Sequence, residues 1–177
     1  VADQMLIAPF NDLEAVAELL REHDDIAAII AEPLQRIIPP EPGFLSGLRE
    51  LCDTHGVLLI FDEIVTGFRL AYGGAQERYG VTPDICTLGK ITGGGFPLAA
   101  IGASADVMRH FDKSAVGEEG WLMQLGTLSG NPVAAAAGLK TMEVLRRNGT
   151  YEKLRASGGA LQKMQSDALT AAGIPHK

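Results

Sequence analysis

The sequence has few of the residues that build metal centres or disulfide frameworks. It contains two cysteines, Cys52 and Cys86, and they do not form a CxxC pair. Its four histidines show no HxxxH or HExxH spacing. Two cysteines cannot hold a small fold together, so we expect both to be reduced, buried thiols. The sequence therefore predicts no metal site and no disulfide-stabilised scaffold.

Clusters of positive charge and long apolar runs are also absent. The formal net charge is −7 at pH 7, with 22 aspartates and glutamates against 15 lysines and arginines. Without a basic cluster, neither nucleic acid nor an anionic membrane is expected as a main partner. An apolar run such as residues 57–61, VLLIF, is far too short to span a bilayer, and the first residues do not resemble a signal peptide. We expect a soluble, cytoplasmic protein.

What the sequence does contain is typical of a globular chain of about one domain. Of its 177 residues, 46% are hydrophobic and 21% are charged, and its glycines and prolines form no repeats. The first residue is not methionine, and the last seven, AAGIPHK, end on a turn with nothing after it to pack. These ends predict a piece of a longer protein.

Apolar periodicity predicts helices that alternate with short strands. Helical spacing and capping residues predict helices at residues 11–24, 43–56, 131–148 and 150–173, with a further short helix within 68–84. Continuous apolar runs predict strands, buried on both faces in the first two cases, at residues 26–33, 57–63, 84–89 and 98–104. Such alternation predicts an α/β fold with a mostly parallel sheet and helices on both faces. Ligands of these sheets bind beyond the carboxyl ends of the strands, which selects Glu32, Asp62, Lys90 and Thr127.

Lys90 stands in TLGKITGGGFP, after a short apolar strand and before three consecutive glycines. A lysine held at a strand end can act as a nucleophilic amine, and the glycines let the backbone approach a ligand closely. The alternative is a solvated loop charge. A nucleotide P-loop is excluded because GxxxxGK[ST] is not matched, and GGGFP is not a GxGxxG turn.

Asp62 closes the apolar run VLLIF, so it sets a carboxylate at the end of a hydrophobic strand. Because successive strand residues alternate faces, Asp62 and Ile64 share a face while Glu63 points away. An acid beside an aliphatic side chain suits a flat heteroaromatic ring, whose nitrogen pairs with the acid. The alternatives are a helix cap and an ion pair with Arg69.

Thr127 lies in GTLSGNP, a stretch of small and hydroxyl residues directly before a predicted helix. Free N–H groups at a helix start favour an anion such as phosphate, although a simple helix-capping loop would read the same way. An amine, a partner for a ring nitrogen and a phosphate site are together the three contacts that pyridoxal 5'-phosphate (PLP) requires.

The blocks LLIFDEIVTGFR, PDICTLGKITGGGFPLAAIGA and GTLSGNPVAAAAGL, in this order and spacing, resemble the large domain of class III PLP-dependent aminotransferases of fold type I, the aspartate-aminotransferase-like fold. The resemblance lies nearest the glutamate-1-semialdehyde aminomutase-like branch and covers essentially the whole chain. It implies that residues 1–150 are the central and C-terminal part of the PLP-binding domain. Residues 151–177 would then be a helix leading toward a truncated small domain.

The resemblance also implies a role for each candidate residue. Lys90 would hold PLP covalently and shuttle a proton, Asp62 would keep the ring nitrogen protonated, and Ile64 would pack on the ring. Thr127 would bind the phosphate of the neighbouring subunit, which implies a homodimer, and Glu32 would lie near the active site. The substrates would be an amine or amino acid and a keto or aldehyde acceptor.

Two departures bear on the reaction. Val65 replaces the glutamine of many amine- and ornithine-type relatives, as in the aminomutase-like branch, yet EPLQRIIPPEPGF lacks the Gly-Asn of true aminomutases. We therefore expect an aminotransferase. The alternatives are a glutamate-1-semialdehyde 2,1-aminomutase, which serves tetrapyrrole precursor synthesis, and a non-catalytic fragment that binds no cofactor.

Overall fold

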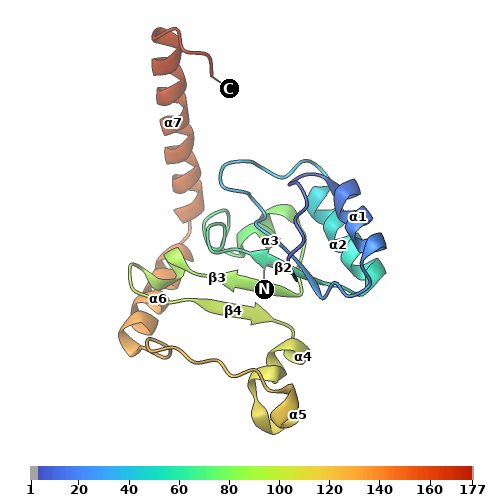
Figure 1. The fold of residues 1–177 in the computed structure, drawn as a ribbon. Helices are drawn as coiled ribbons and strands as arrows, with labels where there is room; N and C mark the ends of the chain where they lie inside the picture. The colour runs from blue at the N-terminus through green and yellow to red at the C-terminus, as the bar shows by residue number, and fades with distance from the viewer. Residues whose placement is uncertain (1–3, 177) are drawn as a thin grey trace.

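A four-stranded sheet forms the centre of the molecule in the computed structural model, which describes residues 4–176 (Figure 1). The strands are β1 (Ala28–Ala31), β2 (Leu58–Asp62), β3 (Ile85–Leu88) and β4 (Ala100–Ala103), in the spatial order β1-β2-β3-β4. The first three strands run parallel, and β4 runs antiparallel to β3. The predicted α/β class, with a mostly parallel sheet flanked by helices, is confirmed.

Helices connect and flank these strands. They are α1 (Leu13–Glu22), α2 (Phe44–His55), α3 (Gly74–Tyr79), α4 (Ala105–Met108), α5 (Lys113–Gly120), α6 (Pro132–Leu145) and α7 (Thr150–Ala171), with 3-10 turns η2 (Lys90–Gly93) and η3 (Arg109–Phe111). The four long helices and the short α3 lie where the sequence predicts them. The helical segment between residues 105 and 120 was not predicted.

Local signals explain the helix ends. The Asp12 carboxylate caps α1 by accepting a hydrogen bond from Ala15 N at 2.9 Å. Helix α2 ends at Gly56, whose φ of 68° places it in the left-handed region that glycine tolerates best. Helix α6 begins with Asn131 as its cap and Pro132 in its first turn.

The hydrophobic core lies on one face of the sheet. Leu59 and Phe61 point from β2 into this face and are fully buried, and α1 and α2 cover them. The residues of this cluster are Val16, Leu20, Phe44, Leu45, Leu48, Cys52, Val57, Leu59, Phe61 and Val81. Burial of this apolar surface is the main stabilising term for the half of the molecule that carries β1 and β2.

The opposite face of the sheet is open in the described part of the chain. Ile30 on β1 is 57% exposed, and Leu58 on β2 is 38% exposed. The prediction that both strands are buried on both faces is therefore wrong here, because α1 and α2 pack on one side only. Asp62 lies on the open face, since residues two apart in a strand share a face.

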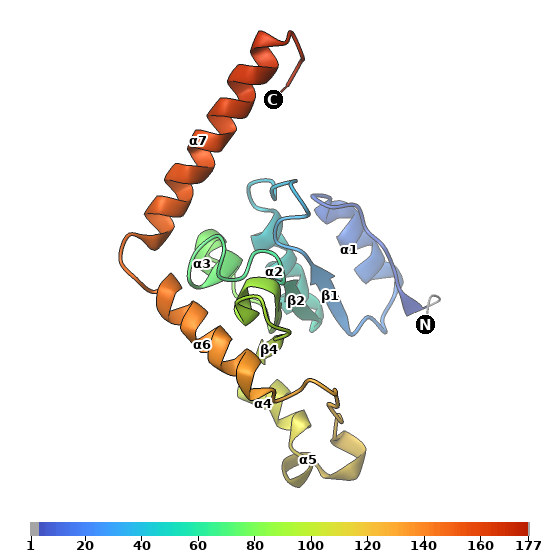
Figure 2. The ribbon, with the colours of Figure 1, turned by 90° about the vertical axis from the view of Figure 1, so that its left-hand side faces the viewer.

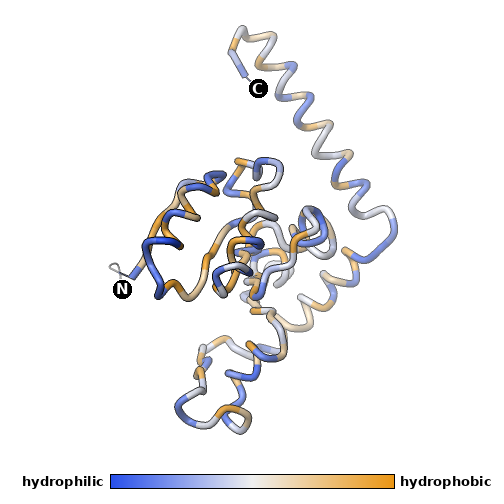
Figure 3. The backbone as a smooth tube through the Cα atoms, turned by 90° about the vertical axis from the view of Figure 1, so that its right-hand side faces the viewer, coloured by the Kyte–Doolittle hydropathy of each residue, from blue (hydrophilic) through white to orange (hydrophobic). Residues whose placement is uncertain are grey.

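Helix α7 is one continuous helix and shows no break at Gly158–Gly159. It extends away from the sheet and alternates hydrophobic with hydrophilic residues along its length (Figures 2 and 3). At its base, the Tyr151 hydroxyl donates a hydrogen bond to Phe68 O at 3.0 Å. The division of the chain at residue 150 stays a prediction.

Candidate functional site

The carboxyl ends of β2 and β3 bring Asp62 and Thr87 side by side, as partners in the parallel register. Asp62 Oδ1 accepts two hydrogen bonds, one from Ile64 N at 3.0 Å and one from the Thr87 hydroxyl at 3.2 Å. Within residues 4–176, Asp62 Oδ2 accepts none, and no ion pair joins Asp62 to Arg69. One carboxylate oxygen is therefore fixed by the protein while the other is free for a ligand.

Asp62 and Glu32 line the same open groove, which has a volume of about 950 Å³. Glu32 directly follows Ala31, the register partner of Phe61, so it lies level with Asp62 across the end of the sheet. Ile30 and Ile60 contribute an apolar lining. The groove thus combines apolar walls with carboxylates at one end, and its volume is that of a small-molecule site.

Lys90 begins the 3-10 turn η2 directly after β3 and is exposed. Its φ is 50°, a left-handed conformation that costs a residue with a side chain about 1–2 kcal/mol. A Cβ built on the preceding Gly89 would lie 3.6 Å from both Cγ atoms of Ile64, so the Ile64 side chain packs against this strand end. No ion pair or side-chain hydrogen bond occupies the Lys90 amine in the described part of the chain.

The glycines after Lys90 serve the docking of α6 behind the turn. Gly94 has a φ of 58°, and a Cβ there would collide with Thr141 Oγ1 on α6. A Cβ on Gly138 of α6 would lie 2.8 Å from Thr92 O in the turn. These glycines let the two backbones approach closely, which fixes the segment that carries Lys90.

The structure brings Asp62, Ile64, Lys90 and Glu32 to one end of the sheet, but not Thr127. Of these, Asp62 and Glu32 line the groove; Thr127 lies in an exposed turn of residues 126–130 and, like Ile64 and Lys90, is not among the groove-lining residues. The cap of α6 is Asn131, whose Oδ1 accepts hydrogen bonds from Val133 N at 2.9 Å and Ala134 N at 3.2 Å.

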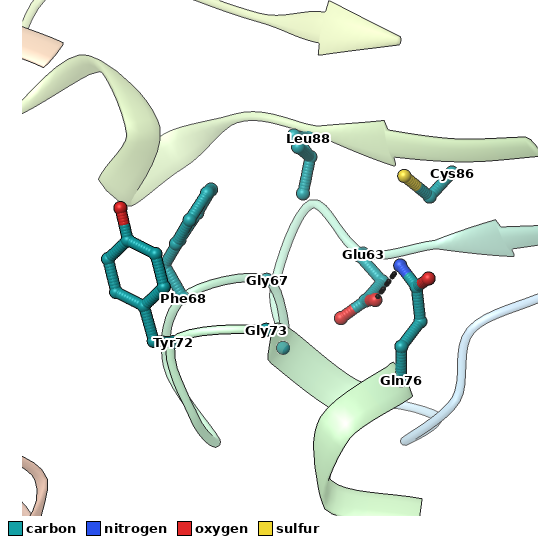
Figure 4. A pocket seen from close by; sticks show the side chains of 9 residues that line it. Glu63, Gly67, Phe68, Tyr72, Gly73, Gln76, Cys86 and Leu88 are labelled. Atoms are coloured by element: carbon teal, nitrogen blue, oxygen red, sulfur yellow. Dashed lines mark hydrogen bonds between the residues drawn. The ribbon is translucent and has the colours of Figure 1, made fainter. Parts of the chain in front are cut away.

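Two residues near the site were missed by sequence reasoning. Thr87 faces Asp62 only through the register of β2 and β3, which no local pattern reveals. Glu63 is 1% exposed and accepts hydrogen bonds from Thr66 Oγ1 at 3.0 Å and Ala75 N at 2.6 Å. It also accepts one from Gln76 Nε2 at 2.9 Å, which Figure 4 shows. Strand alternation indicated that Glu63 points away from Asp62, but not that it is buried.

Another carboxylate, that of Asp84, links β2 to α2. Asp84 Oδ2 accepts hydrogen bonds from Leu59 N at 2.7 Å and Arg49 Nη1 at 2.8 Å. Burial acts to raise the pKa of Asp84, but these two donors outweigh it and leave the pKa below its usual value. Asp84 is a structural group, remote from the groove.

Both cysteines are free thiols; Cys52 is buried, as predicted, whereas Cys86 is only half-buried. Burial raises the pKa of Cys52 to about 11 and also raises the pKa of Cys86, so neither is an activated nucleophile. In the described residues, no three potential metal-ligating side chains come together, and no helix is long and apolar enough to cross a membrane.

Known structures share the fold of this chain. The chain aligns with an omega-transaminase from Sphaerobacter thermophilus with a TM-score of 0.89 and 40% identity, covering 98% of this chain and 40% of that one. It also aligns with a transaminase with PLP bound, with a TM-score of 0.86 and 31% identity over 95% of this chain and 40% of that one. The fold is therefore that of an α/β chain of the fold type I transaminase class.

Sequence comparison gives the family. The model of the class-III aminotransferase family matches residues 2–174, and the chain belongs to this family, whose members use PLP. A relative, glutamate-1-semialdehyde 2,1-aminomutase 2 of Brevibacillus brevis, is 47% identical over 99% of this chain. The chain spans about two fifths of the length of such relatives, 41% in this case.

Proposed function

We propose that this chain forms the cofactor-binding core of a PLP-dependent class III aminotransferase. The reaction is the transfer of an amino group between an amine or amino acid and a carbonyl acceptor. The observation that carries the proposal is the pair of free groups at neighbouring strand ends, Asp62 Oδ2 and the Lys90 amine. The location that we propose is cytoplasmic.

The groove fits PLP in the chemistry of its groups. Asp62 Oδ2 has no hydrogen-bond donor from the described protein, so it can accept one from a protonated ring nitrogen. Ile64 packs beside Gly89 on the same side and offers an apolar surface to a flat ring. When bound, PLP supplies an electron sink that stabilises negative charge on a substrate carbon.

The residues of this chain would then divide the work. The Lys90 amine holds the cofactor and carries a proton to and from the substrate carbon. Asp62 would hold the ring nitrogen in its protonated form, and the Ile64 side chain would offer an apolar surface to the ring. Glu32 presents a carboxylate at the edge of the groove, where a polar substrate or cofactor group can be oriented.

Thr127 is proposed to act across a homodimer, by binding the cofactor phosphate of the neighbouring site. The support is that exposed apolar side chains lie close to Thr127 in the sequence. These are Leu122, Met123, Leu125 and Leu128, which are 60%, 61%, 76% and 54% exposed. An exposed apolar patch of this kind marks a protein–protein contact.

The proposal is tested by borohydride reduction in the presence of PLP, with the longest natural form of the chain. Peptide mass spectrometry should find the reduced label on Lys90. Lys90→Ala should lose the label and turnover, whereas Lys140→Ala should keep both, because Lys140 pairs with Glu143 on the surface of α6. Label on a different lysine, or no label, would overturn the proposal and favour the alternative, a non-catalytic fragment that binds no cofactor.

The aminomutase is a second candidate because of the 47% identity to glutamate-1-semialdehyde 2,1-aminomutase 2. An aminomutase moves the amino group within one molecule, whereas a transaminase requires a second substrate as acceptor. Turnover of a single purified amino substrate without any keto acid or aldehyde would favour the aminomutase. Strict dependence on an added acceptor would favour the transaminase.

Subunit exchange tests the role of Thr127. Lys90→Ala and Thr127→Val proteins should each be inactive or impaired. If Thr127 serves the partner's site, a mixed dimer contains one site with both native residues, and mixing should restore activity. Mixing without recovery would show that Thr127 does not act across the interface.

A further inference from the structure

Glu63 lies on the far side of β2 from the groove and is almost completely buried. Its carboxylate accepts three hydrogen bonds, from two different parts of the chain, and Figure 4 shows the one from Gln76. Thr66 belongs to the turn that follows β2, whereas Ala75 and Gln76 belong to the first turn of α3. One buried side chain therefore ties the end of β2 to a helix more than ten residues later.

Helix α3 depends on this contact at its start. The cap position, Gly73, provides no side-chain hydrogen bond, so Glu63 Oε2 receives the Ala75 N–H instead, at 2.6 Å. Gly74 has a φ of 68°, and a Cβ there would collide with Glu63 Oε2. The loop therefore has no room for a side chain at residue 74, and the Glu63 carboxylate fixes the path of the backbone there.

The backbone of Glu63 is held as tightly as its side chain. Its N–H donates to Thr87 O on β3 at 3.0 Å, and its carbonyl accepts from Gly67 N at 2.8 Å. A Cβ on Gly67 would lie 2.7 Å from that carbonyl oxygen. Contacts from the sheet, the turn and α3 thus meet at this single residue.

The two chain neighbours of Glu63 are the proposed cofactor contacts, Asp62 and Ile64. Ile64 N donates to Asp62 Oδ1, and Thr87, whose carbonyl receives the Glu63 N–H, donates its hydroxyl to the same oxygen. A shift of Glu63 would change the direction of both neighbours, because the three residues are consecutive at the end of β2. The contacts that hold Glu63 therefore also hold the face of the turn that meets the groove.

We propose that Glu63 is a positioning residue, whose buried carboxylate fixes Asp62 Oδ2 and the Ile64 side chain in the orientation that PLP binding requires. This inference rests on the proposed function. Glu63 contacts a second cavity of about 330 Å³ on the side of β3 away from Asp62, so it acts through its neighbours and not by touching the cofactor.

The test compares Glu63→Gln with the control Glu77→Gln in the longest natural form of the chain. Glu77 Oε2 also accepts a hydrogen bond at the start of α3, from Gly73 N at 2.7 Å, but it is exposed. In Glu63→Gln, at most one amide oxygen can accept, so at least one donor loses its partner. Three readouts are the dissociation constant of PLP, the pH midpoint of the bound cofactor's absorbance, and hydrogen exchange of the Ile64 and Ala75 amides.

Glu63→Gln should weaken PLP binding by about tenfold, the equivalent of one hydrogen bond to a charged group. It should also shift the absorbance midpoint and speed exchange at Ile64 and Ala75. Glu77→Gln should leave PLP affinity and the midpoint unchanged. A folded Glu63→Gln protein with wild-type affinity and midpoint would overturn the inference, even if its stability fell.

A milder variant covers the case in which Glu63→Gln does not fold. Gln76→Ala removes one donor that is only partly buried, and should weaken PLP binding with the same shift in midpoint. Unchanged binding and midpoint in Gln76→Ala would then overturn the inference. If wild-type protein binds PLP on Lys90 but these variants behave like it, only the role of Glu63 fails; if wild type binds no PLP, the proposed function and this inference fail together.

Discussion

Replacement of Thr87 by valine should weaken PLP binding at a cost to stability of at most about 1 kcal/mol. Valine has nearly the shape of threonine but cannot donate to Asp62 Oδ1, which keeps its other hydrogen bond, from Ile64 N at 3.0 Å. The Thr87 bond is 3.2 Å long, beyond the usual O–H···O range, so we assign it about 1 kcal/mol, less than a well-formed bond to a charged group contributes. The expected loss is therefore about fivefold in the dissociation constant of PLP.

The measurement is a PLP titration followed by absorbance, together with urea unfolding of the cofactor-free protein. Thr54→Val is the matched control, because the Thr54 hydroxyl donates to Glu50 O on the exposed side of α2, remote from the groove. Thr87→Val should bind PLP more weakly than Thr54→Val, while both stay folded and unfold within about 1 kcal/mol of wild type. Equal PLP affinity in Thr87→Val and wild type would refute the idea that this hydroxyl orients Asp62.

Three further predictions address the surroundings of the site. Because Lys90 has a φ of 50°, Lys90→Gly should unfold with a free energy about 0.5 kcal/mol higher than Lys90→Ala in urea titrations; the opposite order would argue against the left-handed turn. Asp84→Asn should lower the free energy of unfolding by about 2 kcal/mol at pH 7, since it weakens hydrogen bonds from Arg49 and Leu59 to a carboxylate. The folded pKa of Asp84 is lowered, so its stabilisation is present above the unfolded pKa of about 4 and is lost as pH falls from there through the folded pKa. The difference in unfolding free energy between wild type and Asp84→Asn should therefore be smaller at pH 3 than at pH 7. Cys52, with a pKa of about 11 and no exposed surface, should resist iodoacetamide at pH 8 until denaturant is added, and rapid labelling of the native protein would contradict this burial.

The sequence predicted the elements whose signals are local. Asp12, Gly56 and Pro132 mark helix ends by their own capping chemistry, and the structure places the helices there. Apolar runs that end in Asp62 and Gly89 gave the strand ends, and the rule for parallel sheets then gave the end of the sheet at which a ligand would bind. The candidates Asp62, Ile64 and Lys90 all lie at that end of the sheet in the structure, and their roles stay predictions.

Features that depend on distant contacts were not predictable. The antiparallel β4 follows from the tight turns of residues 89–99, and the helices between residues 105 and 120 are short, weakly amphipathic and interrupted at Gly117, where φ is 75°. The hydrogen bond from Thr87 to Asp62 requires the register between two strands. The burial of Glu63 requires α3 to fold back on β2, which no periodicity in the sequence encodes.

At the end of β2, successive side chains point to opposite faces, so residues proposed to bind the cofactor alternate with residues that stabilise the fold. Phe61 and Glu63, the residue after β2, are both buried: Phe61 lies in the core, and the Glu63 carboxylate accepts three hydrogen bonds. Asp62, between them, faces the open groove and has one carboxylate oxygen without a donor among the described residues. Substitutions on the groove side should therefore change PLP affinity at nearly constant stability, and core substitutions such as Phe61→Leu should do the reverse. Of the three residues, Glu63 is the one whose substitution should change both PLP affinity and stability, because it is buried like a core residue but directly follows Asp62 in the chain. Measurement of affinity and unfolding free energy for all three positions would thus separate a positioning role from a purely structural one.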